Sequence, residues 1–296
     1  MAGQECEMHL GTSGFSFDDW KGTVYPETLP KPQWLIYYEQ QLGFNALEVN
    51  YTYYAMPTHR TMQGLVRKTS ERFRFTVKTH RSMTHDILQT GHAIQDNPMA
   101  FEQFREGLQP MTDSGKLGCV LAQFPYAFFN KPETREYVVK TIDRLSDLNL
   151  VLEFRNKSWT GPKTLESLAK RGVGFCIVDE PFDSALPRSG RIPSGVEGEP
   201  PLPQLMPWVP AVTSETGYIR FHGRNAEQWF GTTTEERYNY LYSDTELREL
   251  VQRVKDIPEK VQRWNLFFNN CHAGAAAKNA RRFKELLLES GITVAF

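Results

Sequence analysis

The clearest strand signal in the chain lies at residues 73–79, which read FRFTVKT. Successive side chains of a strand point to opposite faces, so the apolar residues at 73, 75 and 77 share one face. Arg74, Thr76, Lys78 and the following His80 share the other face. Because one face of a barrel strand packs on helices while the other lines the interior, this pattern predicts a barrel strand with Lys78 directed inward.

Seven further short runs rich in β-branched or aromatic residues occur along the chain, and stretches of helical periodicity separate them. The predicted strands are residues 8–13, 46–50, 73–79, 118–123, 150–154, 174–178, 218–221 and 264–268. The predicted helices are residues 32–42, 98–111, 132–148, 165–171, 244–255 and 275–290. Strands that alternate with helices are typical of βαβ units, which build a parallel sheet.

The segment after the first strand decides between the two common parallel folds. Gly11-Thr-Ser-Gly14 lacks the glycine spacing that an open doubly wound sheet uses for a dinucleotide turn. We therefore predict an α/β fold, a (β/α)8 TIM barrel with a closed parallel sheet, in which residues 1–296 form a single domain. Residues 181–216 contain eight prolines and form an insertion between the sixth and seventh strands, either as a cover over the barrel mouth or as a neutral insertion.

Composition limits the classes of partner and the compartment. The chain has 34 basic and 35 acidic residues and a net charge of −1, which argues against wrapping long nucleic acids by bulk electrostatics. No C-x-x-C spacing occurs among Cys6, Cys119, Cys176 and Cys271, which predicts buried, reduced cysteines. The first ten residues, MAGQECEMHL, carry no secretion signal, and no apolar stretch approaches the ~18 residues of a membrane span. We therefore expect a cytoplasmic protein that is not inserted in a membrane.

Alternation in the other strands directs further polar residues to the interior, near the carboxyl ends where barrel enzymes keep their chemistry. The predicted catalytic residues are Glu48, Lys78, Glu153 and Asp179. The predicted substrate-binding or anion-binding residues are Asn50, Gln123, Arg155, Arg220, His222, Arg224, Asn269, Asn270, His272, Trp20 and Trp159. The alternative is a structural ion network that fills the barrel, although desolvation makes such networks weak evidence for stability.

The charges of this set favour an anionic ligand. Lys78 and three arginines face three carboxylates, which leaves one positive charge in excess. Because nearby carboxylates raise the pKa of a lysine, we expect a charged Lys78 rather than an imine-forming amine. Barrels often bind phosphate in the loops after the seventh and eighth strands, here residues 222–225 and 269–274. Gly223 and Gly274 would let an anion approach the backbone, and ordinary turns are the alternative.

Metal binding is the less favoured use of the same residues. Glu48, Glu153, Asp179, His222 and His272 could act as ligands, but the chain has no H-E-x-x-H motif and cations lie among the candidates. We therefore predict no metal and no cofactor, with a divalent metal as the alternative, because Lys78 and the arginines would repel it.

Motifs spread over almost the whole chain match one known family. They are Gly11-Thr-Ser-Gly14, Trp20-Lys-Gly22, Glu48-Val-Asn50, Phe75-Thr-Val-Lys78, Gln123-Phe-Pro125, Glu153-Phe-Arg155, Asp179-Glu180-Pro181, Arg220-Phe-His222-Gly223-Arg224 and Phe268-Asn269-Asn270. The chain resembles the YecE-like family, known as domain of unknown function 72. This resemblance implies a TIM barrel and brings no established activity.

Three functions fit these residues. The leading hypothesis is an enzyme that acts on a small anionic or phosphorylated, sugar-like or nucleotide-like substrate, a hydrolase or an isomerase or lyase, with Glu48 or Glu153 as general acid or base. The second is a nucleic-acid-binding or nucleic-acid-processing protein that grips a strand with rim arginines such as Arg224. The third is a non-catalytic metabolite-binding protein. The sequence does not define an oligomeric state.

Overall fold

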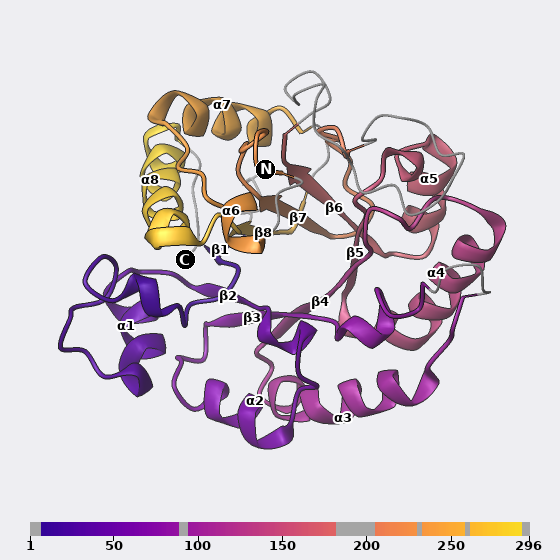
Figure 1. The fold of residues 1–296 in the computed structure, drawn as a ribbon, viewed down its shortest axis with the longest axis horizontal. Coiled ribbons are helices and arrows are strands. Elements are labelled where there is room, and N and C mark those ends of the chain that lie inside the picture. Colours follow the sequence, from indigo (N-terminus) through magenta and orange to yellow (C-terminus); the bar gives the residue numbers. More distant parts are fainter. Residues whose placement is uncertain (1–6, 89–93, 182–204, 230–232, 258–260, 292–296) are drawn as a thin grey trace, which may run out of the picture.

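Eight parallel strands form one nearly closed barrel in the computed structural model, which describes residues 7–88, 94–181, 205–229, 233–257 and 261–291 (Figure 1). Each strand lies beside its neighbours in the order β1-β8-β7-β6-β5-β4-β3-β2. The strands are β1 (Glu7–Thr12), β2 (Ala46–Val49), β3 (Arg74–Lys78), β4 (Leu117–Gln123), β5 (Leu150–Glu153), β6 (Gly174–Asp179), β7 (Thr216–Phe221) and β8 (Arg263–Phe268). The predicted (β/α)8 TIM barrel is therefore confirmed, and each strand agrees with its predicted range within two residues.

Helices surround the barrel on its outside (Figure 1). They are α1 (Trp34–Gln40), α2 (His59–Val66), α3 (Pro98–Asp113), α4 (Pro132–Leu145), α5 (Pro162–Lys170), α6 (Thr234–Arg237), α7 (Asp244–Lys255) and α8 (Ala275–Glu289). Helix α2 and the four-residue α6 were not predicted. Helix α2 has only eight residues, of which Met62 is buried, and it begins at a capping box made by Thr58 and Thr61.

Side-chain alternation on β3 follows the prediction. Phe75 and Val77 are fully buried in the core outside the barrel, while Thr76 contacts Cys119 on the neighbouring strand inside it. Lys78 ends the strand and reaches Gln123 at the end of β4. The interior of the barrel is therefore polar towards the carboxyl ends of the strands.

The barrel closes between β1 and β2 with almost no backbone ladder. Ser13 and Glu48 form an isolated bridge at the carboxyl end of this seam. Further down, the hydroxyl group of Tyr38 in α1 lies between the two strands, where it accepts from the Thr12 amide at 2.8 Å and donates to the Ala46 carbonyl at 3.1 Å. One buried phenol thus satisfies two backbone groups that a ladder would otherwise pair.

A second side chain continues this seam towards the amino ends of the strands. The amide group of Asn45 accepts from the Leu10 amide at 2.8 Å and donates to the Met8 carbonyl at 2.7 Å. Gly11 lies between these contacts, and a Cβ atom there would come 2.0 Å from the Ala46 carbonyl oxygen. Glycine is therefore required at this position because the neighbouring strand lies against it.

Only the end of the proline-rich insertion lies in the described part of the chain, since residues 182–204 fall outside it. Leu205 and Met206 are buried, and the Met206 amide donates to Glu180 at 3.1 Å. Whether the insertion covers the mouth stays a prediction. Among the helices of the described residues, none is both long and apolar enough to cross a bilayer.

Candidate functional site

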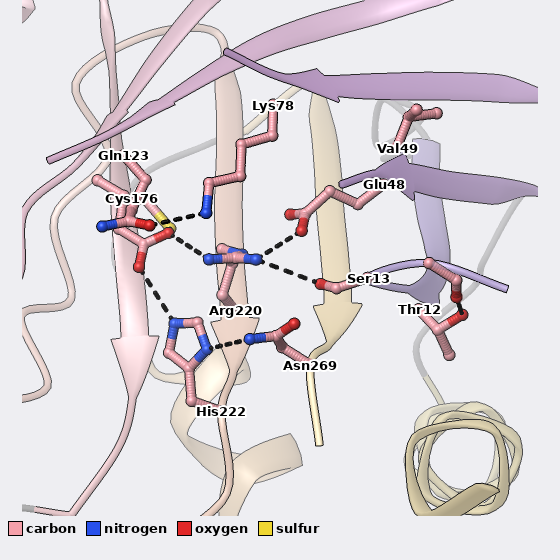
Figure 2. Close-up of polar contacts among 12 residues, drawn as sticks. Thr12, Ser13, Glu48, Val49, Lys78, Gln123, Cys176, Arg220, His222 and Asn269 are labelled. Carbon is pink, nitrogen blue, oxygen red and sulfur yellow. Dashed lines mark hydrogen bonds and ion pairs between the residues drawn. The ribbon is translucent and has the colours of Figure 1, made fainter. Parts of the chain in front are cut away.

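A buried arginine at the end of β7 organises the barrel interior. Arg220 is 1% exposed, and its two terminal nitrogens donate to Glu48 at 2.6 Å and to Glu153 at 2.7 Å. Figure 2 shows its guanidinium group beside Glu48 and Ser13, with residues of several strands around it. Glu48 also accepts from the Tyr218 hydroxyl at 2.6 Å. The two carboxylates, both fully buried, are therefore used to neutralise this cation.

Glu153 has two further contacts, both at its Oε1 atom. The Nε atom of Arg155 donates to this oxygen, and Nε2 of His222 lies 3.2 Å from it. The Nδ2 atom of Asn269 lies 3.0 Å from His222 Nδ1, which fits a neutral ring that donates from Nε2 to Glu153 (Figure 2). Burial alone would raise the pKa of Glu153, but the guanidinium groups of Arg155 and Arg220 hold that pKa well below its usual range. Glu153 is therefore ionised.

Glu180 completes this network and was missed as a site residue. Its Oε2 atom lies 2.9 Å from Arg155, and burial raises its pKa to about 7 despite that contact. Counting alternate residues along β6 from the inward Cys176 leads to Glu180, so strand alternation contained the signal. Asp179, the residue predicted instead, points to the opposite face.

Asp179 and Arg224 pair with each other away from this network, so their predicted place in one common mouth is wrong. Arg224 lies 2.7 Å from Asp179 and also within 3.6 Å of Glu246 and Glu249, and Tyr242 donates to Asp179 at 2.6 Å. Both residues line a separate hollow of about 350 Å³. Because three carboxylates already surround Arg224, it is poorly suited to grip a nucleic-acid strand.

A cavity of about 860 Å³ lies over the buried network at the mouth of the barrel. Its cationic lining within the described residues is Lys78, Arg155, Arg220 and Arg237, and its carboxylates are Asp18 and Asp19. Asp18 pairs with Lys31 at 2.7 Å, and Asp19 accepts from the Ala273 amide at 2.7 Å. Glu48 and Glu153 do not line this cavity, and both are fully buried and paired with Arg220. Because Arg155 and Arg220 are paired with buried carboxylates, Arg237 is the arginine of the described lining that has no carboxylate partner.

Lys78 faces this cavity as a weakly basic amine. Its Nζ atom donates to Gln123 Oε1 at 2.8 Å and lies 4.5 Å from the centre of the Tyr53 ring. Burial and the positive charge of Arg220 lower the pKa of Lys78 to about 7. The expectation of a raised pKa and a charged Lys78 is therefore wrong, because the carboxylates of the interior are already paired with arginines.

Arg237 is a second cavity residue that sequence reasoning missed. It ends α6, a helix too short to leave a periodic pattern, and its buried Nε atom has no partner among the described residues. The buried Nε of Arg220 and Oδ1 of Asn50 are likewise unpaired, and both residues line the cavity. Unpaired buried polar atoms are costly, so three of them around one cavity favour a polar ligand there.

Comparison with known proteins places this geometry in a family. A family model described as a protein of unknown function, DUF72, matches residues 9–294. The chain belongs to the DUF72 family. The resemblance seen in the motifs is thereby confirmed.

Relatives of this DUF72 chain extend over nearly its full length. The UPF0759 protein YunF of Bacillus subtilis is 28% identical and aligns over 95% of this chain and 94% of its own. A crystal structure of a DUF72 protein from Thermotoga maritima has 40% identity and a TM-score of 0.81, covering 95% of this chain and 99% of that one. Another, from Enterococcus faecalis, has 26% identity, a TM-score of 0.76 and 95% coverage of both chains. These similarities support the fold and bring no activity.

In this DUF72 barrel, the backbone amides after the seventh and eighth strands that were expected to bind an anion donate to other groups of the protein. The Gly223 amide donates to the Tyr242 hydroxyl at 2.8 Å, and Asp19 takes the Ala273 amide before α8. Asn270 donates to the Tyr240 carbonyl at 2.8 Å and is fully buried. These donors therefore hold loops together, and the prediction of an anion cradle there is wrong. Asn269 and His272 still line the main cavity.

Two tryptophans predicted to touch ligand lie in the hydrophobic core instead. Trp20 is fully buried and donates to the Cys271 carbonyl at 2.7 Å. Trp159 is stacked on Phe154 with ring centres 4.4 Å apart and donates to the Phe128 carbonyl at 2.6 Å. Neither ring lines the cavity, so both serve packing. Within the described residues there is no group of three or more His, Cys, Asp or Glu side chains arranged to hold a metal ion.

Proposed function

We propose that this DUF72 protein is an enzyme that acts on a small anionic substrate, sugar-like or nucleotide-like, in the cavity over Arg220. The observation that carries the proposal is a large cavity walled by Arg155, Arg220, Arg237 and the weakly basic Lys78, in which Arg237 has no carboxylate partner among the described residues. A phosphate or carboxylate group would compensate this charge, and an arginine binds either group through two parallel hydrogen bonds.

The roles of the residues follow from what each one faces. Arg237 and Arg155 bind the anionic group from the cavity wall, and Asn50 offers an unpaired carbonyl oxygen to a hydroxyl group. Lys78 acts as the acid–base group, since its pKa of about 7 lets it both accept and release a proton near neutral pH. Glu48 and Glu153 hold Arg220 in place, which replaces the acid–base role that the sequence suggested for them.

Binding and turnover test this proposal separately. Titration calorimetry with inorganic phosphate and a panel of phosphorylated sugars measures binding, and the same panel is screened for turnover. Arg237→Gln is expected to weaken binding of phosphorylated compounds about tenfold or more, the loss of one charge-assisted hydrogen bond. Arg105→Gln is the matched control, because Arg105 pairs with Asp147 on the surface and is absent from the cavity.

The outcomes separate the remaining alternatives. Turnover that Lys78→Met abolishes while binding persists supports the enzyme. Binding without turnover across the panel would instead favour a non-catalytic metabolite-binding protein. If Arg237→Gln and Arg105→Gln bound every anion equally well, the anion site would be in the wrong place. Retention of single-stranded nucleic acid that falls steeply with salt would favour the nucleic-acid function.

A further inference from the structure

We propose that Lys78 is a covalent nucleophile, which forms an imine with the carbonyl group of an anionic aldehyde or ketone bound in the cavity. This inference rests on the proposed function and names its substrate class. It depends on three features of the described residues: where the Lys78 amine lies, what holds it, and which charges surround it.

The surroundings of the half-buried Lys78 differ from those of Lys116, a buried lysine of the described residues. Lys116 is tied by its Nζ atom to the Val66 carbonyl at 2.8 Å and the Thr69 carbonyl at 2.7 Å, and it does not line the cavity. Lys78 has a single oxygen acceptor, Gln123, and lines the cavity wall. The Lys78 amine is therefore accessible to a bound molecule, whereas the Lys116 amine is held by backbone carbonyl groups.

Gln123 holds the amine without supplying a charge. The hydrogen bonds fix which atom of the Gln123 amide is oxygen and which is nitrogen. Nε2 donates to the Phe124 carbonyl at 2.8 Å, which leaves Oε1 to accept from Lys78 (Figure 2). No carboxylate oxygen of the described residues lies within 4.0 Å of the Lys78 nitrogen. An amide acceptor orients the amine and, unlike a carboxylate, does not lock it in the protonated form.

The charged and titratable groups around Lys78 come from every neighbouring strand end. They are Glu48 on β2, Glu153 and Arg155 at the end of β5, Arg220 on β7, and Tyr53 and His85 outside the strands. Burial and Arg220 are the main causes that lower the pKa of Lys78 to about 7, and the carboxylates oppose them. At pH 7.5 most of the amine is then unprotonated, roughly a thousandfold more than for a lysine of ordinary pKa. A free lone pair is what attack on a carbonyl requires.

The step balances without an oxidant or a metal. The Lys78 nitrogen forms a bond to the carbonyl carbon while the C=O π pair moves to oxygen, and one N–H proton passes to that oxygen to give a carbinolamine. The C–O bond then breaks, the oxygen leaves as water with the second N–H proton, and C=N forms. Arg155 and Arg237 bind the anionic end of the same molecule, so the carbonyl group is presented to Lys78.

Reductive trapping tests this step on the full-length chain. The wild type is incubated at pH 7.5 with dihydroxyacetone phosphate or glyoxylate and sodium borohydride, and peptide mass spectrometry locates the secondary amine formed. Neutral dihydroxyacetone is the matched probe without the anion. Lys78→Arg keeps the positive charge and cannot form an imine, and Lys140→Arg on the surface of α4 is the control variant.

We expect the anionic probes to modify Lys78 at least about tenfold more than any exposed lysine, given its larger unprotonated fraction. Modification is expected to fall as the pH decreases through 7, to be weaker with dihydroxyacetone, and to be unchanged in Lys140→Arg. Modification spread evenly over Lys78 and surface lysines would overturn the inference. So would an absence of trapping while calorimetry shows that the anionic probes bind, an outcome that leaves the proposed function standing. If the anionic probes neither bound nor were trapped, the inference and the proposed function would both be overturned.

Discussion

Removing the charge of Glu153 tests whether the buried network is held by electrostatic compensation. Glu153→Gln keeps the shape of the side chain but leaves Arg155 and Arg220 with one fewer carboxylate. Losing one partner of a buried ion pair costs about 3–5 kcal/mol, and we expect the lower end, about 3 kcal/mol, because Arg155 keeps Glu180 and Arg220 keeps Glu48. That is a decrease of roughly a hundredfold in the ratio of folded to unfolded protein.

Urea denaturation followed by tryptophan fluorescence measures this change. The transition midpoint is expected to fall by about 1 M at pH 7 with an unchanged slope. The control Glu136→Gln removes an exposed pair with Lys140 on α4, which is worth at most about 0.5 kcal/mol. A midpoint for Glu153→Gln equal to that of this control would refute the reasoning.

The same variant has a characteristic pH dependence. The folded pKa of Glu153 lies below its unfolded value of about 4.3, so its contribution to stability is complete above that value and is lost as the pH falls towards the folded pKa. The difference in unfolding free energy between wild type and Glu153→Gln should therefore be constant from pH 6 to 8 and shrink below about pH 4.

Three further predictions concern the seam and a buried histidine. Tyr38→Phe leaves the Thr12 amide and Ala46 carbonyl unpaired and should lower the free energy of unfolding by about 1–3 kcal/mol in urea denaturation; no loss would mean that water replaces the hydroxyl. Gly11→Ala should lower the free energy of unfolding by at least about 3 kcal/mol, because the added Cβ atom meets the Ala46 carbonyl. In Gly64→Ala on α2 the added atom meets nothing, so the free energy of unfolding should rise by about 0.5–1 kcal/mol. Equal melting temperatures of the two variants would contradict this prediction. Burial and Lys78 lower the pKa of His85 to about 3, so its ring should show no NMR titration between pH 5 and 8. Its contribution to stability should decrease below about pH 6.5, because there only the unfolded chain takes up the proton. A titration midpoint near pH 6.5 would exclude this environment.

The sequence predicted the fold well where apolar and polar residues alternate regularly along an element. Alternation along residues 73–79 reports directly which face is buried, so the strands were located closely. Helix α2 was not found in this way, because its eight residues are fewer than the window over which helical periodicity is counted.

The candidate site was readable only as far as strand alternation reaches. It directed Glu48, Lys78 and Glu153 to the barrel interior, where they lie, but ended one residue early on β6, which gave Asp179 in place of Glu180. Arg237 could not be found by periodicity, because α6 has only four residues. The sequence does not show how deeply a charged group is buried or which charges lie beside it, and the low pKa of Lys78 arises from burial and from the positive charge of Arg220, which outweigh Glu153 and Glu48.

The seam between β1 and β2 also sets the order in which this chain can finish folding. β1 has its full ladder only with β8, from Glu7 opposite Arg263 to Thr12 opposite Phe268. A ribosome that makes roughly 5–20 residues per second needs on the order of 13–50 s between these two strands. During that time the first strand of the nascent chain has no backbone partner along most of its length. The barrel therefore cannot be completed before residues 263–268 have been made, and loss of these residues would leave β1 without its ladder.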